Sequence, residues 1–276
     1  MALAKVTALT LAAVASMAQT PQPDPLARAR QLYNDARYDE AIDSATQAKQ
    51  IPALSNAAGI VLGRAHLERF RKSRVVDDLA AGRAALNQVE SATLPAREYV
   101  ELLVGLGEAL YLDACFDGCY TAAAELFERA LARADAVEPR ARELIFEWWA
   151  GALDRQAQYG PASERKALYE RILRRSEEAL DKNDTSAAAT YWLAAAARGV
   201  DDIERAWGAA MAGWVRAPHL GPAGVELRAD LERLVTHVLL PERARQIAGD
   251  GDARPALENL RAQWDEIKKK FGGTIP

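Results

Sequence analysis

The sequence predicts an all-α protein that is built from antiparallel helix hairpins. Apolar residues make up 50% of the 276-residue chain, and alanine, the best helix former, dominates them. Apolar positions recur at helical spacing along most of the chain, and no stretch shows the alternation rich in valine and isoleucine that is typical of strands. Two sequence patterns also recur at intervals of about 40 or 80 residues, which indicates a helical repeat.

The first 18 residues have the features of a secretory signal peptide. Lys5 is the only charge before Asp24, and a stretch of small and apolar residues follows it. Ser16 and Ala18 are the small residues that a signal peptidase requires, which predicts cleavage after Ala18. The apolar run is too short to span a bilayer, and no later segment reaches the roughly 18 uncharged apolar residues of a membrane-spanning helix. We therefore expect an exported protein, periplasmic or secreted, without a transmembrane helix. The alternative is an amphipathic or disordered N-terminus.

Two segments share a pattern that predicts the second helix of a hairpin. In each segment an aromatic residue is followed by small or apolar residues three, seven and ten positions later. These positions are Tyr38, Ala41, Ala45 and Ala48 in the first segment, and Tyr120, Ala123, Phe127 and Ala130 in the second. This spacing puts them on one helix face, where small side chains let a neighbouring helix approach closely.

A second pattern predicts the first helix of a hairpin. Leu62-Gly63 and Leu106-Gly107 are each followed, two positions later, by an alanine. Glycine inside a helix costs roughly 1 kcal/mol relative to alanine, so close helix packing is expected at both glycines. We expect Ala123 to contact the preceding helix near Gly107. Ala136 is expected near the end of the same helix as Ala123, on roughly the opposite face.

These patterns resemble the tetratricopeptide-repeat (TPR) family. The best match is the tract with Gly118, Tyr120, Ala123, Phe127, Ala130 and Leu131, followed by residues 38–48. Residues 55–88 match in part, through Leu62-Gly63, Ala80 and Ala84, whereas residues 140–180 keep the helical period with a degenerate signature. The resemblance implies helix pairs that stack into a right-handed superhelix with a concave inner face for peptides or proteins, and it implies no chemistry.

The chain divides into four predicted regions. These are a signal peptide (1–18), a TPR-like helical repeat array (24–180), a C-terminal helical region (181–271) and a tail (272–276). The polar box of residues 181–184 separates the array from the C-terminal region. There we expect helices over 186–198, 203–217 and 225–240, a break or restart at Pro241, and a last helix from Pro255 to about Phe271.

The resemblance also implies which side chains the inner helices present to a partner. These are Arg30, Tyr33, Asn34, Arg64, Glu108 and Tyr111. The alternative is an ordinary solvated surface at these positions. Most of the six tryptophans are expected to fill the core. Trp148 and Trp149 are adjacent and cannot both face one way, so one of them is a candidate for the concave surface.

The two cysteines, Cys115 and Cys119, flank a turn at Asp117-Gly118. A local disulfide and two partly buried thiols both remain open, and a metal site is the third alternative. The histidines at 66, 219 and 237 are scattered, whereas a zinc site normally needs three or four protein ligands.

The sequence motifs predict no catalytic residues, no cofactor and no metal. The serine-hydrolase, zinc-protease and phosphate-loop signatures are all missing. The net charge of −4, with basic residues interspersed among acids, argues against nucleic acid as a partner. We expect a non-enzymatic scaffold that binds a protein or peptide outside the cytoplasm. The alternatives are a structural subunit of a cell-envelope assembly, for which self-association is expected, and a helical carrier of a small apolar ligand linked to a transporter.

Overall fold

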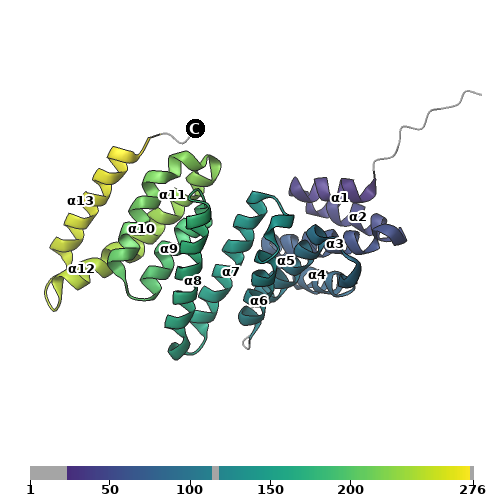
Figure 1. Cartoon of the computed structure of the whole chain (residues 1–276), viewed down its shortest axis with the longest axis horizontal. Coiled ribbons are helices and arrows are strands. Elements are labelled where there is room, and N and C mark those ends of the chain that lie inside the picture. Colours follow the sequence, from purple (N-terminus) through teal and green to yellow (C-terminus); the bar gives the residue numbers. More distant parts are fainter. Residues whose placement is uncertain (1–23, 114–117, 274–276) are drawn as a thin grey trace, which may run out of the picture.

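The computed structural model describes residues 24–113 and 118–273, and this part of the chain is helical without strands. The α-helices are α1 (Pro25–Asn34), α2 (Tyr38–Lys49), α3 (Ser55–Ser73), α4 (Val76–Asn87), α5 (Ala96–Asp113), α6 (Cys119–Leu131), α7 (Pro139–Tyr159), α8 (Ala162–Lys182), α9 (Ala187–Gly199), α10 (Ile203–Arg216), α11 (Pro222–Leu234), α12 (Leu240–Ala248) and α13 (Arg254–Phe271). They follow one another along an elongated molecule, from α1 at one end to α13 at the other (Figure 1). The all-α prediction is confirmed.

The helices pack in adjacent pairs. The most extensive contacts join successive helices, such as α1 with α2, α3 with α4, α5 with α6, and α8 with α9. A second set of contacts joins each odd-numbered helix to the next odd-numbered one, from α1 through α11. The odd-numbered helices therefore lie side by side in one row, and this row positions the candidate site described below.

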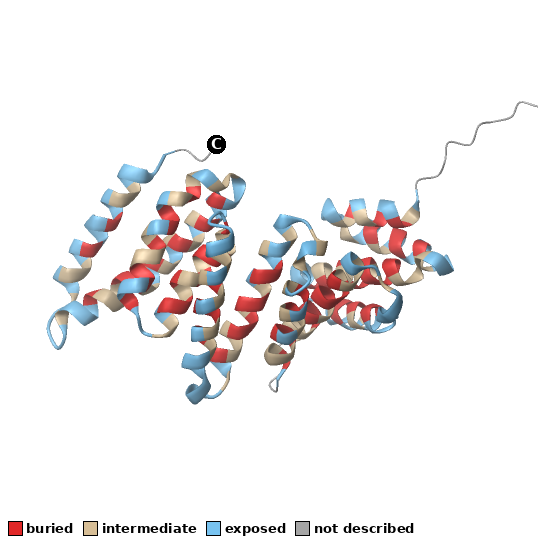
Figure 2. Ribbon diagram, in the orientation of Figure 1, coloured by how far each residue is buried: buried red, intermediate tan, exposed pale blue. Residues whose placement is uncertain are grey.

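The first repeat pattern marks the buried faces of α2 and α6. Ala41, Ala45 and Ala48 are fully buried, as are Ala123, Phe127 and Ala130. Figure 2 shows buried residues along the packed faces of the helices. The glycines of the second pattern lie at close helix crossings. A Cβ atom on Gly63 would come within 2.5 Å of Leu86 Cγ in α4, and one on Gly107 would come within 2.7 Å of Phe127 Cε1 in α6.

The sequence placed the wrong face of α4 against α3. Ala80 and Ala84 were expected to match the small positions of the repeat, yet both are exposed. The buried face carries Leu79, Gly82 and Leu86 instead. Gly82 lies where a Cβ atom would come within 2.9 Å of the Gly63 carbonyl oxygen, so two glycines share this crossing.

Replacing Ala123 with leucine should lower the free energy of unfolding by about 1–3 kcal/mol, because the site has no room for three more heavy atoms. Ala123 is fully buried in the cluster that contains Phe127 and Val104. Ala136, expected on the opposite face of the same helix, lies outside that helix: α6 ends at Leu131, and Ala136 is half-buried against the main core in a 3₁₀ turn, so it is unsuitable as an exposed control. Ala84→Leu, on the exposed face of α4, is the matched control and should cost little. Chemical denaturation of both variants tests this order, and equal tolerance would contradict the hairpin packing.

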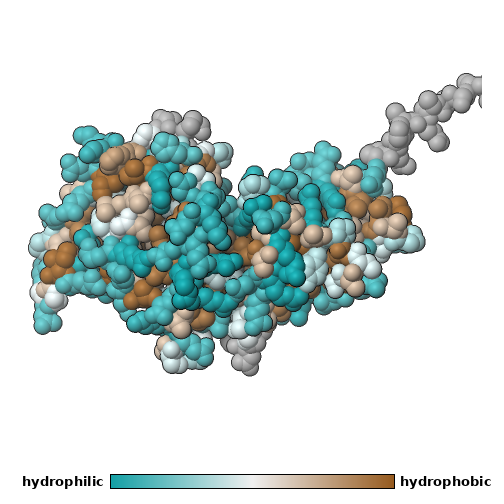
Figure 3. All heavy atoms as spheres, in the orientation of Figure 1, coloured by the Kyte–Doolittle hydropathy of each residue, from teal (hydrophilic) through white to brown (hydrophobic). Residues whose placement is uncertain are grey.

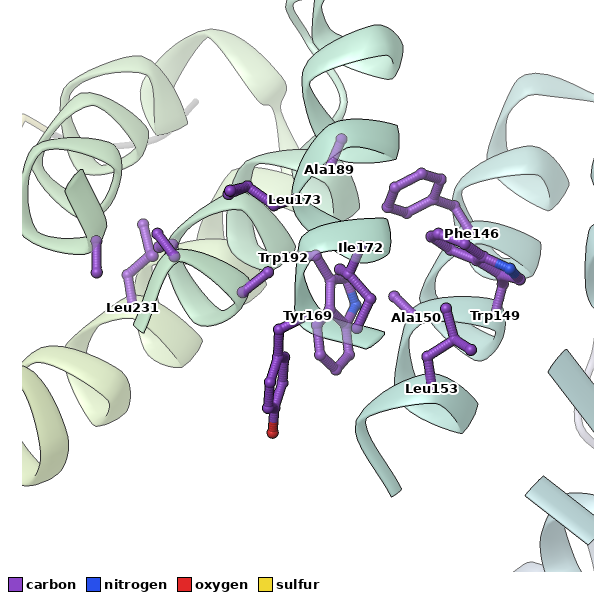
Figure 4. Packing of buried hydrophobic residues seen from close by; sticks show 14 of the residues in the cluster. Phe146, Trp149, Ala150, Leu153, Tyr169, Ile172, Leu173, Ala189, Trp192 and Leu231 are labelled. Carbon is purple, nitrogen blue, oxygen red and sulfur yellow. The ribbon is translucent and has the colours of Figure 1, made fainter. Parts of the chain in front are cut away.

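The main apolar core extends across the predicted boundary at residue 181. Its largest cluster runs from Val100 in α5 to Trp264 in α13. Figure 4 shows side chains from α7, α8, α9 and α11 within it, among them Trp149, Ile172, Trp192 and Leu231. The array and the C-terminal region thus share one core where α8 packs on α9.

The helix expected over 225–240 begins earlier and continues past Pro241. It starts at Pro222 as α11, widens into a π-helical turn over Val235–Leu239, and goes on as α12. Pro241 lies at the second position of α12. A proline lacks the backbone N–H that a helix interior needs, and the π-turn just before it accommodates that loss.

Candidate binding groove

An open groove of about 640 Å³ lies on the row of odd-numbered helices, and we call it the inner groove. Its lining comes from α3 and its C-terminal cap, from α5, from α7 and from α9. The lining residues are Glu68, Arg71, Lys72, Arg74, Tyr111, Leu112, Leu144, Glu147, Trp148, Gly151, Asp154, Arg155 and Trp192. Four successive odd-numbered helices thus contribute to one site. On the face seen in Figure 3, hydrophilic side chains cover most of the surface, with smaller apolar patches between them.

Aromatic rings form the floor of the inner groove. The Trp148 ring lies edge-on to Tyr111, with centroids 5.0 Å apart, and stacks on the buried Phe127 ring at 5.9 Å. Trp192 from α9 also lines the groove. Trp149, by contrast, is 1% exposed in the core. One of the two adjacent tryptophans therefore reaches the groove, and it is Trp148.

Two arginines are fixed against this aromatic floor. The Arg71 guanidinium lies 5.2 Å from the Trp148 ring centroid, and its Nη1 donates hydrogen bonds to both carboxylate oxygens of Glu68, at 2.9 and 3.1 Å. Arg155 donates to the hydroxyl oxygens of Tyr111 and Tyr159, at 3.4 and 3.3 Å. Both guanidinium groups are thereby oriented while remaining accessible from the groove.

A buried carboxyl group lies beneath the groove wall. Glu108 of α5 is 2% exposed, and its Oε1 has no hydrogen-bond partner among the described residues. Burial and, to a smaller extent, the neighbouring Glu68 carboxylate raise the pKa of Glu108 to about 8, although Arg64 and Arg71 oppose the shift. Carboxyl groups buried beside a second carboxylate commonly stay protonated at neutral pH. Glu108 was expected at the binding surface, and it lies under that surface instead.

Four of the other predicted contact residues lie together in a small cavity that is separate from the inner groove. Arg30, Tyr33, Asn34 and Arg64 line a small cavity of about 50 Å³ between α1, α3 and α5, together with Arg97 and Glu101. Arg30 Nη2 donates to Glu98 at 2.9 Å, and the Arg64 guanidinium lies 5.0 Å from the Tyr33 ring centroid. Burial also raises the pKa of Tyr33. These polar groups mainly join three helices, and only Tyr111 of the six lines the inner groove.

The residues that sequence reasoning missed are the cations of the groove and Trp192. Three of the missed cations lie at the C-terminal end of α3: Arg71 and Lys72 are in its last turn, and Arg74 is its C-cap. The helix dipole favours basic residues at such an end, so their presence in the sequence does not indicate a binding site. The Trp148-Trp149 pair was the one feature of the sequence that pointed to the groove, because two adjacent tryptophans on a helix must face different ways.

A further hollow of about 400 Å³ lies among α7, α8 and the start of α9. Glu143, one of the two acidic residues in its lining, accepts hydrogen bonds from the Ser186 hydroxyl at 2.9 Å and from the Ala188 backbone N–H at 3.1 Å. Glu143 therefore caps the N-terminus of α9, which is a structural role.

Several predictions fall on residues outside the described part of the chain. The predicted signal peptide (1–18) and Cys115 lie outside the described residues. The cleavage site and the pairing of Cys115 with Cys119 therefore stay predictions. Cys119 itself is buried at the start of α6. Within residues 24–113 and 118–273, no group of three potential metal ligands lies together. None of the helices in these ranges has the length and apolar character to cross a membrane.

No protein-family model, no curated protein and no solved structure matches this chain. The geometry and chemistry of the inner groove are therefore the observations that bear on function.

Proposed function

We propose that the chain is a TPR-like scaffold that acts outside the cytoplasm and binds a protein or an extended peptide in the inner groove without catalysing a reaction. The observation that supports this most strongly is the lining of one 640 Å³ groove by α3, α5, α7 and α9. A ligand that follows such a groove contacts several repeats at once, which suits an extended chain. The row of odd-numbered helices would then be the inner layer of a right-handed superhelix.

The chemistry of the groove favours a peptide over a small apolar ligand. Seven of its thirteen lining residues carry a charge. The remainder includes Tyr111, Trp148 and Trp192, and aromatic residues together with arginine are the side chains enriched at protein interfaces. An apolar ligand would leave the charged groups of the wall without water or partners, which costs free energy.

Selection of a random-peptide phage library on the purified protein tests the proposal. Selected peptides should bind the wild-type protein and lose about tenfold or more in affinity with Trp148→Ala or Arg155→Ala. Val76→Ala is the control, because Val76 is 70% exposed and does not line the groove. Calorimetry measures the affinities, and circular dichroism checks the fold of each variant. Selected peptides that bind the groove variants as tightly as the wild type would overturn the proposal, as would a library that yields no binders.

Export makes its own testable prediction. N-terminal sequencing of the protein from its native host should give Gln19 as the first residue, because the small residues Ser16 and Ala18 precede the expected cleavage point. A mature chain that still begins with Met1 or Ala2 would remove the assignment to a compartment outside the cytoplasm.

A further inference from the structure

The two sides of the inner groove differ in the sign of their net charge. The basic wall, Arg71, Lys72 and Arg74, comes from the end of α3. The acidic wall consists of Glu147 and Asp154 on α7, and the one cation on this helix that lines the groove, Arg155, donates to the hydroxyls of Tyr111 and Tyr159. Asp230 and Glu226 on α11 do not line the groove, but their charges act on Glu147. Tyr111 on α5, Trp148 on α7 and Trp192 on α9 line the same groove.

The basic wall keeps positive charge available to a partner. Lys72 Nζ lies 4.5 Å from the Tyr38 ring centroid, and the Arg74 guanidinium lies 5.7 Å from the Phe70 ring centroid. Neither has an acidic partner among the described residues, and both are exposed. Glu68, the acid on this side, is already engaged by Arg71. The cations at the end of α3 therefore outnumber the acids that neutralise them.

The acidic wall keeps negative charge available in the same way. Glu147 forms no ion pair or hydrogen bond with any described residue and is exposed at the groove. Partial desolvation raises the pKa of Glu147, the carboxylates of Asp230 and Glu226 also raise it, and Arg71 of the basic wall opposes the shift. Asp230 is partly neutralised by Arg233, its neighbour on the same helix. Repulsion among these carboxylates is relieved when a cation approaches them.

We propose that the inner groove binds an extended peptide segment whose charges are segregated about an apolar residue. An acidic residue of the segment pairs with Lys72 and Arg74, the apolar residue contacts the aromatic floor, and a basic residue pairs with Glu147. This inference rests on the proposed function, and it adds the class of peptide and the way it is oriented.

Electrostatic complementarity supplies the selectivity. Charges that meet like charges across an interface weaken binding, whereas opposite charges accelerate association and fix the register of the ligand. Because the two walls have opposite signs, a peptide with mixed charges along its length always meets one wall with the wrong sign. A segregated peptide satisfies both walls in one orientation.

Two synthetic peptides of identical composition test this. The segregated peptide carries three aspartates on one side of a central Gly-Phe-Gly and three lysines on the other. The alternating peptide distributes the same aspartates and lysines evenly. We expect calorimetry at low salt to show about tenfold tighter binding of the segregated peptide, since exposed ion pairs contribute up to about 1 kcal/mol each. The difference should shrink as salt is added.

Charge-reversal variants test whether the preference for the segregated peptide arises in the inner groove. Lys72→Glu combined with Arg74→Glu should abolish the preference, because the basic wall becomes acidic. Arg174→Glu combined with Lys269→Glu makes the same change in net charge at exposed positions that do not line the groove, and should keep the preference. Glu147→Lys should also abolish it.

Each outcome decides one claim. If display-selected peptides bind the groove but the segregated and alternating peptides bind equally, the charge inference is overturned and the peptide-binding proposal stands. If the control variant loses the preference as fully as the groove variant, the effect is one of net charge, and the inference is again overturned. If neither synthetic peptide binds and display yields no binders, both proposals fall.

Discussion

Phe127→Ala is expected to lower the free energy of unfolding by about 3–5 kcal/mol, the usual cost of removing a fully buried aromatic ring. Phe127 is 0% exposed, its ring fills the place that a Cβ atom on Gly107 would occupy, and it supports Trp148 from below. The loss therefore affects both the α5–α6 contact and the floor of the inner groove. Urea denaturation followed by circular dichroism measures it. Phe271→Ala is the matched control, because Phe271 is 38% exposed at the end of α13 and should cost less than about 1 kcal/mol.

A double-mutant cycle with Gly107 separates this specific contact from a general loss of core. Gly107→Ala alone should destabilise the protein, because the new Cβ atom meets the Phe127 ring. In the Phe127→Ala background the same change should be neutral or stabilising, since the space is empty and alanine is favoured over glycine in a helix by about 1 kcal/mol. Additive effects in the cycle would show that the two residues do not contact each other.

Glu108→Gln is expected to change how stability depends on pH. Burial raises the pKa of Glu108 from 4.5 to about 8 in the folded protein. The folded state therefore holds a proton that the unfolded state releases above pH 4.5, so stability is greatest below that pH and falls as pH rises toward 8. The loss amounts to at most about 1.4 kcal/mol per pH unit. Glutamine is neutral and of similar shape, so the variant should be less dependent on pH and more stable than the wild type at pH 8.

Denaturation at pH 5, 6, 7 and 8 measures the two curves. Glu125→Gln, an exposed carboxyl on α6, is the control and should leave the wild-type curve unchanged. If the Glu108→Gln and wild-type curves remain parallel across this range, Glu108 is not held protonated beneath the groove.

The sequence by itself determined the all-helical class and the regular features of each hairpin. The spacing from Tyr38 to Ala48 and from Tyr120 to Ala130 is local information, and it identified the buried faces of α2 and α6 correctly. The interior glycines at 63 and 107 predicted close helix crossings, because a glycine there needs compensation from packing. Such features depend on one helix and its immediate neighbour.

The prediction of which helix face is buried was wrong where residue type does not distinguish the two faces. In α4, alanine occupies both the exposed positions 80 and 84 and the buried position 85, so small size alone did not mark the face that contacts α3. The TPR resemblance predicted Glu108 at the surface of an inner helix, where it would contact a partner. Only the stacking of α3 against α5 shows that Glu108 is buried close to the side chains of Glu68, Arg64 and Arg71.

Only the tertiary structure decided where the candidate site lies. Arg71, Tyr111, Trp148 and Trp192 are separated by many residues in the sequence, and each belongs to a different helix. They meet because each odd-numbered helix packs on the next, which brings one position from every second helix to a common surface. Local periodicity specifies a helix and its apolar face, but the relative placement of non-adjacent helices results from packing of side chains that are distant in the sequence.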